Sequence, residues 1–491
     1  MSSIFKPALV LMVGRALGFA IAFCVPLVLV RIFDQAEFGT YKQLFLIYGT
    51  LLGVAQLGMA ESLYYFVPSA SWEGGRYVMN AWLGLAISGL LCVGALAGAG
   101  SSISSWMGNS QLAPLFPFLV VFLLLTLPSA TLEITMIARQ RYPLASWSYA
   151  LSDLARATLC LIPVLVLPKL EVLLLGTIVF ALLRLGVAWW YLRYEFDHDL
   201  KPDLGLLKRQ LTYALPFAVA VLVEIVQANF HQYAVSYHFD AATFAIYAVG
   251  CLQIPLVDFV ATSTGTVMMV QMVEMIHDGR GHAVVVLWND MTRKLALIFF
   301  PLVGLLLVNA RELIVFLFTE NYLASVPIFM VFSLSILLSA FPIEGMLRVY
   351  AQTRFLVVLN VIRLLVIAAF IHWFLSTLHL VGAVLITMLA LAIGKGLGMA
   401  RMKRLMEVGL MDLLPWRSLA AIGGVAAVAG LPALLIKSGP ALSTLPLLVT
   451  TSLVYTASYL ALAIGFRLLH ERERAGIAHW LRLWSAGPFK A

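Results

Sequence analysis

The stretch from Lys6 to Pro68 decides how this chain is organised. It opens with the apolar run PALVLMVGRALGFAIAFCVPLVLVRI, residues 7–32, which a single charge, Arg15, interrupts. As a helix this run would rise roughly 36 Å, at about 1.5 Å per residue, which is enough to cross a bilayer. After a short polar turn the chain returns to apolar sequence that carries a second lone charge, Glu61. Because a charge at depth is costly unless it meets a partner or water, these two residues predict a polar interior between spans.

The whole chain has the composition of an integral membrane protein. Hydrophobic residues make up 62% of its 491 residues, charged residues make up 11%, and the mean hydropathy is +0.97. A soluble domain has about a quarter charged residues, so this chain is built mostly of membrane spans. The net charge of +8 does not indicate a nucleic-acid partner, because the cytoplasmic loops of membrane proteins collect Lys and Arg.

Apolar stretches of spanning length recur along the chain and predict an all-α polytopic fold with fourteen transmembrane helices. They lie near residues 8–30, 41–67, 78–101, 113–137, 147–167, 171–193, 212–236, 241–270, 284–308, 323–346, 355–377, 379–400, 417–437 and 443–468. With the N-terminus placed in the cytoplasm, most of the 32 Lys and Arg fall in cytoplasmic segments. This asymmetry predicts that both termini are cytoplasmic.

The two sides of the central loop resemble each other. The pattern Asp-x-x-x-Phe-x-x-Tyr follows the first span at residues 34–41 and the seventh span at residues 240–247. The matching topological place predicts a duplicated six-span unit, and parallel repeats of this kind in transporters hold substrate between their halves. The domains that we predict are an N-lobe (1–193), a cytoplasmic linker (194–211), a C-lobe (212–400), spans 13 and 14 (401–468) and a basic amphipathic cytoplasmic tail (469–491).

Ionisable residues recur inside the predicted spans, mostly in their cytoplasmic halves. They are Arg15, Glu61, Glu133, Asp153, Arg156, Arg184, Glu344, Arg363 and Lys395. Asp153 and Arg156 are three residues apart on one helical face and can pair with each other. The other cations have no acid nearby in sequence, although Glu61, Glu133 and Glu344 could each neutralise one across a helix interface. Cations that face a water-filled cavity would bind an anionic group, and the planar fork of Arg suits phosphate.

A different polar stripe lies on the seventh span. Glu224, Gln227 and His231 share one helical face, and Asp258, just after Pro255 in the eighth span, lies at a depth comparable to that of Glu224. A carboxylate beside a histidine could bind a coupling cation, H+ or Na+, and the alternative is a hydrogen-bonded structural group. The sequence has no metal-ligand spacing, phosphate-binding loop or nucleophile elbow. We therefore expect a protein that is not an enzyme and has no cofactor or metal beyond the coupling cation.

Three stretches give the chain a resemblance to a known family. They are Gly14-Arg15-x-x-Gly18 through Pro26-Leu27 to Arg31 with Glu37-Phe38-Gly39-x-Tyr41 and Gly58, then Ser152-Asp153-Leu154-x-Arg156-Ala157, and finally Lys201-Pro202-Asp203-Leu204-x-Leu206-Leu207-Lys208 with Tyr213-Ala214-Leu215-Pro216-Phe217. On these motifs the chain resembles the polysaccharide transporters of the MOP flippase superfamily, the Wzx-type O-antigen flippases of bacteria. Ala214 departs from the usual pattern, which has Gly at that position.

The resemblance implies two six-helix lobes around a central cavity, with two further C-terminal helices. It also implies the substrate, an oligosaccharide on a polyprenyl pyrophosphate, such as an O-antigen or exopolysaccharide repeat unit, flipped from the cytoplasmic to the periplasmic leaflet of the inner membrane. Membrane lipids, polysaccharide polymerases and glycosyltransferases are the further partners that we expect. The residues expected to bind substrate are Arg15, Glu61, Arg156, Arg184, Arg363 and Lys395, and those expected to couple an ion are Glu224, His231 and Asp258.

Other functions remain open at the level of sequence. A drug/cation antiporter of the related MATE group would have twelve spans and a net acidic cavity. Lipid II flippases have fourteen spans, but their characteristic first-span motif is not evident here. A membrane-embedded glycosyltransferase or polysaccharide polymerase needs a sizeable outer loop for its catalytic acid, and no predicted outer loop is large enough. A scaffold for a polysaccharide assembly complex would leave the buried charges without a task.

Overall fold

A computed structural model describes residues 2–70, 73–439 and 443–469. Helix accounts for 88% of the structure, and the described residues contain no strand, as predicted for an all-α fold. The chain divides into two compact units, which we treat separately: unit 1 comprises residues 1–249 and 360–387, and unit 2 comprises residues 250–359 and 388–491. The predicted linker 194–211 lies inside unit 1. The predicted amphipathic tail falls almost entirely on residues 470–491, outside the described residues.

The helices of unit 1 follow one another in chain order. They are α1 (Ser2–Ile32), α2 (Gln35–Ala55), α3 (Met59–Ser69), α4 (Gly74–Trp106), α5 (Phe116–Ser129), α6 (Thr131–Ala138), α7 (Tyr142–Val166), α8 (Leu170–Phe196), α9 (Leu204–His238) and α10 (Ala241–Gly250), whose last residue already belongs to unit 2. The helices of unit 2 are α11 (Pro255–His277), α12 (Gly281–Val308), α13 (Ala310–Phe318), α14 (Val326–Ser339), α15 (Ile343–Val349), α17 (Leu410–Leu413), α18 (Trp416–Val428), α19 (Gly430–Lys437) and α20 (Thr444–Gly465). The long helix α16 (Thr353–Leu405) contributes to both units.

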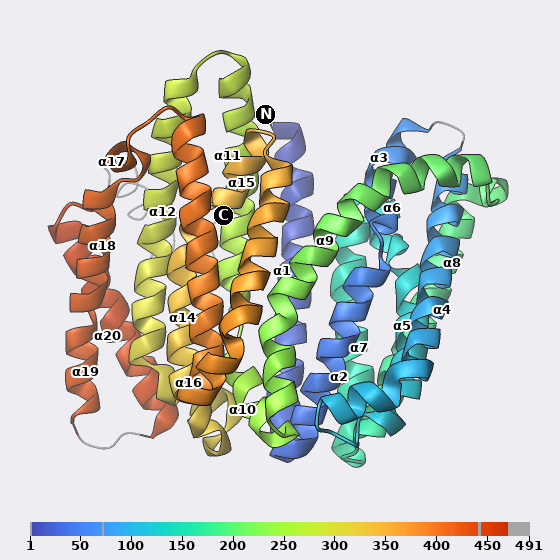
Figure 1. Ribbon diagram of the computed structural model, residues 1–491, viewed down its shortest axis with the longest axis horizontal. Coiled ribbons are helices and arrows are strands. Elements are labelled where there is room, and N and C mark those ends of the chain that lie inside the picture. Colours follow the sequence, from blue (N-terminus) through green and yellow to red (C-terminus); the bar gives the residue numbers. More distant parts are fainter. Residues whose placement is uncertain (1, 71–72, 440–442, 470–491) are drawn as a thin grey trace, which may run out of the picture. The chain divides into compact units, whose positions relative to one another are not determined.

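Within the described residues, thirteen helical segments are long and apolar enough to cross a membrane. One of them, α16, has 53 residues, and at about 1.5 Å per residue it is more than twice as long as a bilayer core is thick. Its backbone turns at His379, where φ is +49° and ψ is −138°, and α16 folds back as a hairpin (Figure 1). A Cβ on Gly382 would lie 2.1 Å from the carbonyl oxygen of Phe374, so only glycine fits this reversal. Counted as two spans, α16 brings the number to the fourteen that the sequence predicts.

Several spans are broken partway. The second span stops at the end of α2 and restarts as α3, and between them Leu57 and Gly58 have positive φ. The fourth span breaks between α5 and α6, and the tenth breaks at Phe341-Pro342 between α14 and α15. In a membrane such breaks are tolerated where the freed backbone groups are buried in protein or line a cavity.

Helices α1 and α7 of unit 1 pack closely because two glycines of α1 meet α7. A Cβ on Gly14 would lie 2.3 Å from Oγ of Ser146, and one on Gly18 would lie 2.3 Å from a carboxylate oxygen of Asp153. Small residues four apart let helices approach closely in membranes. The Gly14-Arg15-x-x-Gly18 motif therefore has a packing role, and it places the intervening Arg15 beside α7.

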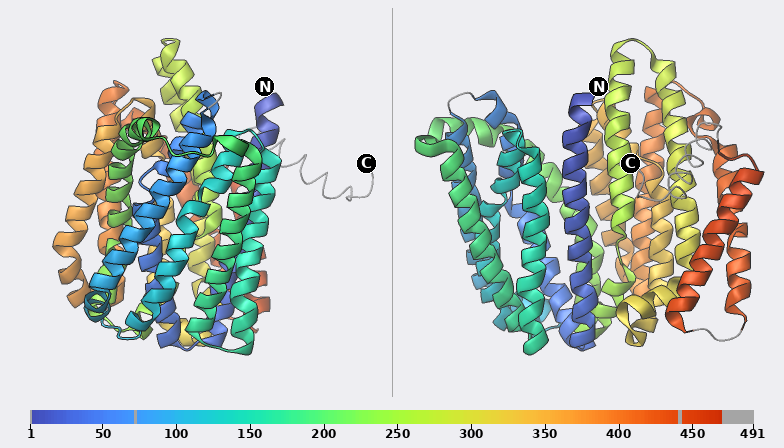
Figure 2. Two further views of the ribbon diagram at one scale, coloured as in Figure 1. Left: turned by 90° about the vertical axis from the view of Figure 1, so that its right-hand side faces the viewer. Right: turned by 180° about the vertical axis from the view of Figure 1, so that it is seen from behind.

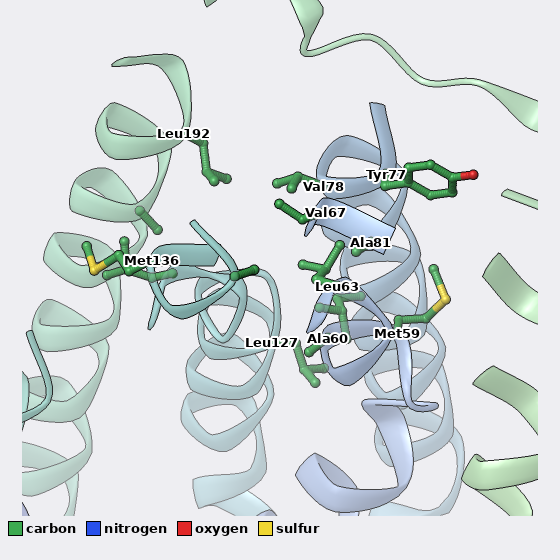
Figure 3. Close-up of a cluster of buried hydrophobic side chains, with 14 of the residues drawn as sticks. Met59, Ala60, Leu63, Val67, Tyr77, Val78, Ala81, Leu127, Met136 and Leu192 are labelled. Atoms are coloured by element: carbon green, nitrogen blue, oxygen red, sulfur yellow. The ribbon is translucent and has the colours of Figure 1, made fainter. Parts of the chain in front are cut away.

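The core of unit 1 is a cluster of apolar side chains from α3, α4, α5, α6 and α8. Figure 3 shows α3 and α4 contributing Leu63, Val67 and Val78, with Met136 of α6 opposite. The hydroxyl of Tyr77 points away from this cluster (Figure 3). Together these contacts fix the rotation of α3 about its axis. They therefore determine which of its side chains lie outside the core.

The repeated Asp-x-x-x-Phe-x-x-Tyr pattern caps the start of a helix at both positions. Asp34 forms a capping box at the start of α2, and Oδ1 of Asp240 accepts a hydrogen bond from the backbone N–H of Thr243 at the start of α10, at 2.8 Å. The Phe and Tyr of both motifs are buried. The two motifs also touch, because a Cβ on Gly39 would collide with the backbone carbonyl of Ala241. The match in local structure supports duplication.

Beside this contact, buried polar side chains join α2 to α9. Gln43 donates to Oγ of Ser236 at 2.6 Å and accepts from Nδ2 of Asn109 at 2.6 Å. Asn109 also donates to Oγ1 of Thr40 at 2.8 Å. Buried side-chain networks of this kind stabilise one arrangement of the helices when every member has a partner. The network therefore specifies the register between α2 and α9.

Replacing Gln43 by leucine is expected to destabilise unit 1, because Ser236 and Asn109 would each lose a buried hydrogen-bond partner. Leaving a buried polar group unsatisfied costs about 1–3 kcal/mol. We expect a clear fall in the thermal unfolding midpoint of the detergent-solubilised protein. Gln111→Leu is the matched control, since Gln111 is exposed and accepts only a long bond from Thr40, at 3.4 Å. Equal midpoints for wild type and Gln43→Leu would contradict this role.

In unit 2, α18, α19 and α20 pack against α12. The hydroxyl of Tyr455 donates to the carbonyl oxygen of Ala426 at 2.9 Å, and that of Tyr459 donates to the carbonyl oxygen of Leu297 at 3.0 Å. Gly304 makes room for Tyr455, because a Cβ there would lie 2.0 Å from its hydroxyl oxygen. Figure 2 shows α20 running beside the span that α18 and α19 form end to end. These last two spans are thus packed into unit 2 by buried tyrosines.

Candidate functional site

The most buried charge of unit 1, Glu133, forms an ion pair across helices. Its Oε2 lies 2.7 Å from Nη2 of Arg184, with only 2% of the Glu133 side chain and 16% of the Arg184 side chain exposed. Its Oε1 accepts a hydrogen bond from Oγ of Ser148, and Nε of Arg184 donates to Oγ of Ser129. The ion pair and its two serine partners therefore connect three parts of unit 1. These are the break between α5 and α6, helix α7 and helix α8.

Unit 2 repeats this arrangement. Nζ of Lys395 lies 2.6 Å from Oε2 of Glu344 and donates to the carbonyl oxygen of Phe341 at 2.8 Å. In both units the acid follows a helix break, and the cation comes 51 residues later in the chain. The Phe341 carbonyl is one of the backbone groups freed by the break, so the cation satisfies it. The prediction that Glu133 and Glu344 could each neutralise a cation across a helix interface is confirmed.

Arg15 is placed differently from these paired cations. Its side chain is exposed, Nη2 donates to the hydroxyl of Tyr149 at 3.2 Å, and the guanidinium carbon lies 5.0 Å from the centre of that ring. Tyr64 of α3 and Glu133 are also within electrostatic range. Among the residues that the structure describes, no carboxylate forms a salt bridge with Arg15. An intramembrane cation of this kind needs an anion or water.

Glu61 lies on α3, one turn after the break in the second span. Its Oε2 is buried and has no hydrogen-bond partner among the described residues. Tyr64, one turn further along α3, interacts electrostatically with Glu61, Arg15, Tyr149 and Glu133. The structure therefore brings Arg15, Glu61 and Glu133 of unit 1 near one tyrosine that the sequence analysis did not single out.

The remaining predicted cations lie elsewhere. Arg156 pairs with Asp153 on the same face of α7, at 2.8 Å, as their spacing predicts. Arg363 is buried in α16, and its Nη1 donates to Oδ1 of Asn360 at 3.4 Å. Lys395 belongs to unit 2. Whether these residues bind substrate stays a prediction.

The residues predicted to couple an ion are found in different settings. His231 is buried, and its Nδ1 lies 2.6 Å from the hydroxyl of Tyr247 in the second Asp-x-x-x-Phe-x-x-Tyr motif. Glu224 is exposed on α9, and Asp258 is exposed in the first turn of α11. His231 and Glu224 belong to unit 1, whereas Asp258 belongs to unit 2. Their role in coupling stays a prediction.

The third motif of the resemblance anchors the start of α9. Oδ1 of Asp203 accepts from the backbone N–H groups of Gly205 and Leu206, at 2.9 and 3.1 Å, and Asn80 of α4 bonds to the Asp203 backbone. The hydrogen bond from Leu206 is the main reason why the pKa of Asp203 is lowered, with Gly205 and Arg76 adding to the effect. The motif therefore holds the central loop against α4.

This lowered pKa predicts a pH dependence of stability. A carboxylate whose pKa is lower in the folded state adds stability above its unfolded pKa, about 3.9, and that stability is lost as the pH falls through the folded value. We expect the unfolding midpoint of the wild type to fall more steeply below about pH 4 than that of Asp203→Asn. The measurement is thermal unfolding in detergent across this pH range, and identical pH profiles for the two proteins would contradict the assignment.

Comparison with protein families gives one match that covers most of the chain. A family described as "Polysaccharide biosynthesis protein" matches residues 28–327. A comparison with curated proteins found no match.

Solved structures with a similar fold include a lipid II flippase, MurJ, in an inward closed conformation. It has a TM-score of 0.73 and 12% identity, and covers 94% of this chain and 99% of its own. A MOP superfamily transporter from Pyrococcus furiosus has a TM-score of 0.57 and 14% identity, and the match covers 83% of this chain and 96% of the transporter. An inward-facing multidrug resistance MATE transporter has a TM-score of 0.59 and 15% identity, and the match covers 80% of this chain and 96% of that transporter. At these identities the likeness shows the fold, which is that of MOP superfamily transporters.

Proposed function

Because this chain belongs to the polysaccharide biosynthesis protein family, we propose that it flips an oligosaccharide linked to a polyprenyl pyrophosphate. The movement runs from the cytoplasmic to the periplasmic leaflet of the bacterial inner membrane, with both termini in the cytoplasm. The fold supports a transporter, and alternating access is the mechanism expected of two repeats around a central site. The substrate is a repeat unit of a surface polysaccharide.

The observation that supports the proposal most is the state of Arg15. Its guanidinium is exposed within a membrane span and hydrogen-bonds a tyrosine rather than a carboxylate. A pyrophosphate would supply the missing negative charge, and the guanidinium offers it several N–H donors in a fixed plane. Because Glu133 neutralises Arg184 and Glu344 neutralises Lys395, we assign these two cations a supporting role within their own units and not the charge that binds the pyrophosphate.

Coupling to a cation gradient completes the proposed mechanism. Glu224, His231 and Asp258 are the residues proposed to bind H+ or Na+. The hydrogen bond between His231 and Tyr247 supports a coupling role, because the tautomer and charge of His231 would affect the second Asp-x-x-x-Phe-x-x-Tyr motif, which lies against the first. Ion binding at His231 would thereby be linked to the contact between α2 and α10.

The experiment that tests the proposed function is leaflet-resolved labelling of lipid-linked oligosaccharide in a strain that lacks this protein. We expect the oligosaccharide to accumulate on the cytoplasmic leaflet and to be cleared when the wild-type gene is restored. Normal appearance of the oligosaccharide on the outer leaflet without the protein, in a strain with no second flippase, would overturn the proposal.

One observation favours a second candidate function, ion-coupled export of organic cations as in MATE transporters. The buried Oε2 of Glu61 has no hydrogen-bond partner among the described residues, and such an oxygen could attract a cationic substrate. Drug sensitivity of the same deletion strain separates the two functions. A strain with normal polysaccharide but raised sensitivity to cationic drugs would favour the antiporter.

A further inference from the structure

We propose that the open face of α3, together with Tyr213 of α9, is a carbohydrate subsite that binds the first sugar of the lipid-linked substrate. The inference rests on the proposed function and deepens it, because it assigns separate residues to the sugar and to the pyrophosphate. The residues of the subsite are Glu61, Tyr64, Tyr65 and Tyr213, and all four belong to unit 1.

Three of these residues share the one face of α3 that does not pack into the core. Glu61, Tyr64 and Tyr65 are spaced three and four apart, so they line one side of the helix. The opposite side of α3, which includes Leu63 and Val67, is fully buried in the core cluster of unit 1. Tyr64 is 41% exposed and Tyr65 is 56% exposed. Two exposed tyrosine rings and a partly buried carboxylate therefore lie on the same side of α3.

The aromatic rings of this surface are held in fixed positions. The ring of Tyr65 stacks on that of Tyr213, with centroids 5.0 Å apart and planes inclined by 14°. Phe66 packs edge-on against Tyr213 and stacks on Tyr77 behind it. Tyr213 itself is 52% exposed. The rings thus form a rigid platform whose outer faces can accept the C–H groups of a pyranose ring, while the tyrosine hydroxyls can bond to sugar hydroxyls.

Glu61 supplies the polar group that such a platform needs. Its Oε2 is buried without a hydrogen-bond partner among the described residues, and a buried oxygen in this state costs free energy until a donor reaches it. An ionised carboxylate only accepts hydrogen bonds. Sugar hydroxyls are donors, and a pair of them can satisfy one carboxylate. A sugar stacked on the neighbouring tyrosines would bring those hydroxyls within reach of Glu61.

A lipid-facing aromatic belt is the other arrangement that exposes tyrosines in a membrane protein. The pair of Trp190 and Tyr194 on α8, with ring centroids 6.1 Å apart and exposures of 67% and 70%, fits that description. The face of α3 does not, because it carries Glu61, and a carboxylate facing lipid would be strongly unfavourable. This face therefore borders a polar space.

The position of Tyr64 links the subsite to the proposed pyrophosphate contact. Tyr64 interacts electrostatically with Arg15 and Tyr149 on one side and with Glu61 on the other. In the proposed substrate the first sugar is bonded directly to the pyrophosphate. A pyrophosphate at Arg15 would place that sugar beside Tyr64, which is where the platform begins.

Binding measurements with two probes test the subsite. Wild-type protein in nanodiscs is titrated with polyprenyl pyrophosphate that carries no sugar and with polyprenyl pyrophosphate that carries one glucosyl residue. We expect the wild type to bind the glucosylated probe about tenfold more tightly. Tyr65→Leu and Glu61→Gln should bind both probes with the affinity that the wild type has for the bare pyrophosphate. Tyr194→Leu, an exposed stacked tyrosine on α8, is the matched control and should behave as wild type.

The outcomes separate the subsite from the proposed function. Equal affinity of the wild type for the two probes, or equal weakening of both probes in Tyr65→Leu, would overturn the subsite while leaving the flippase intact. Failure of folded wild type to bind either probe would overturn both. Because Tyr65 is exposed, its replacement should leave the unfolding midpoint unchanged, and this is checked for every variant.

Discussion

Glu133→Gln is expected to lose about 3–5 kcal/mol of folding free energy, the cost of leaving a buried charge without its partner. The reason is the burial of the pair, since Glu133 is almost fully enclosed and Arg184 has no other carboxylate within salt-bridge distance in the described part of the chain. Glutamine keeps the size of the side chain and one acceptor oxygen but removes the charge. The measurement is reversible unfolding in detergent, or the folded fraction recovered from membranes if unfolding is irreversible.

Two further variants show whether charge is the cause. Glu133→Gln combined with Arg184→Met removes both charges, and apolar replacement of a buried ion pair is often neutral or stabilising. The double variant should therefore recover most of the lost stability. Glu344→Gln should cost less than Glu133→Gln, because the Glu344 side chain is 35% exposed and solvent screens its charge. A double variant as unstable as the single one would show that shape, not charge, sets the effect.

Arg15→Gln is expected to reduce transport by about 10- to 100-fold while the protein folds normally. A hydrogen bond to a charged group contributes about 1.5–3 kcal/mol, and every 1.4 kcal/mol is about tenfold in affinity. Folding should be unaffected, because the Arg15 side chain is exposed and its hydrogen bond goes to the hydroxyl of Tyr149. The readout is the rate at which lipid-linked oligosaccharide reaches the outer leaflet, normalised to the amount of folded protein.

Arg15→Lys is the matched control for this prediction. Lysine keeps the charge but loses the planar fork, so bidentate contact with a phosphate is no longer possible. We expect an intermediate rate, between those of the wild type and Arg15→Gln. Transport at the wild-type rate by correctly folded Arg15→Gln would show that Arg15 does not bind the substrate.

The sequence predicted the number of spans and the charges inside them, because both are properties of single helices. The pairing of Glu133 with Arg184 and of Glu344 with Lys395 was only one possibility at that stage. It depends on which helix faces meet, and hydropathy does not encode that choice. The equal separation of 51 residues in the two halves was present in the sequence and would have pointed to both pairs.

The helix breaks and the aromatic face of α3 were hard to predict for different reasons. Gly58 and Pro342 stand at two of the breaks, but glycine and proline are also tolerated within membrane helices, so the sequence alone does not show where a span unwinds. Tyr64 and Tyr65 could have been found, since they follow Glu61 at helical spacing. Their surroundings could not, because Tyr213 and Arg15 reach them from helices far away in the chain. The first-span motif of lipid II flippases is not evident in this chain, yet the fold is similar to that of MurJ. The similarity of fold therefore does not depend on that motif.

The central claim is that this protein flips a lipid-linked sugar past a cationic site, and purified protein in liposomes tests it most directly. Liposomes would contain a fluorescent polyprenyl pyrophosphate carrying one glucosyl residue, and accessibility to a membrane-impermeant quencher would report flipping. We expect the wild type, with an imposed H+ or Na+ gradient, to expose the inner-leaflet probe, and Arg15→Gln to do so about 10- to 100-fold more slowly. Folded wild type that leaves the probe in its original leaflet under either gradient would contradict the account.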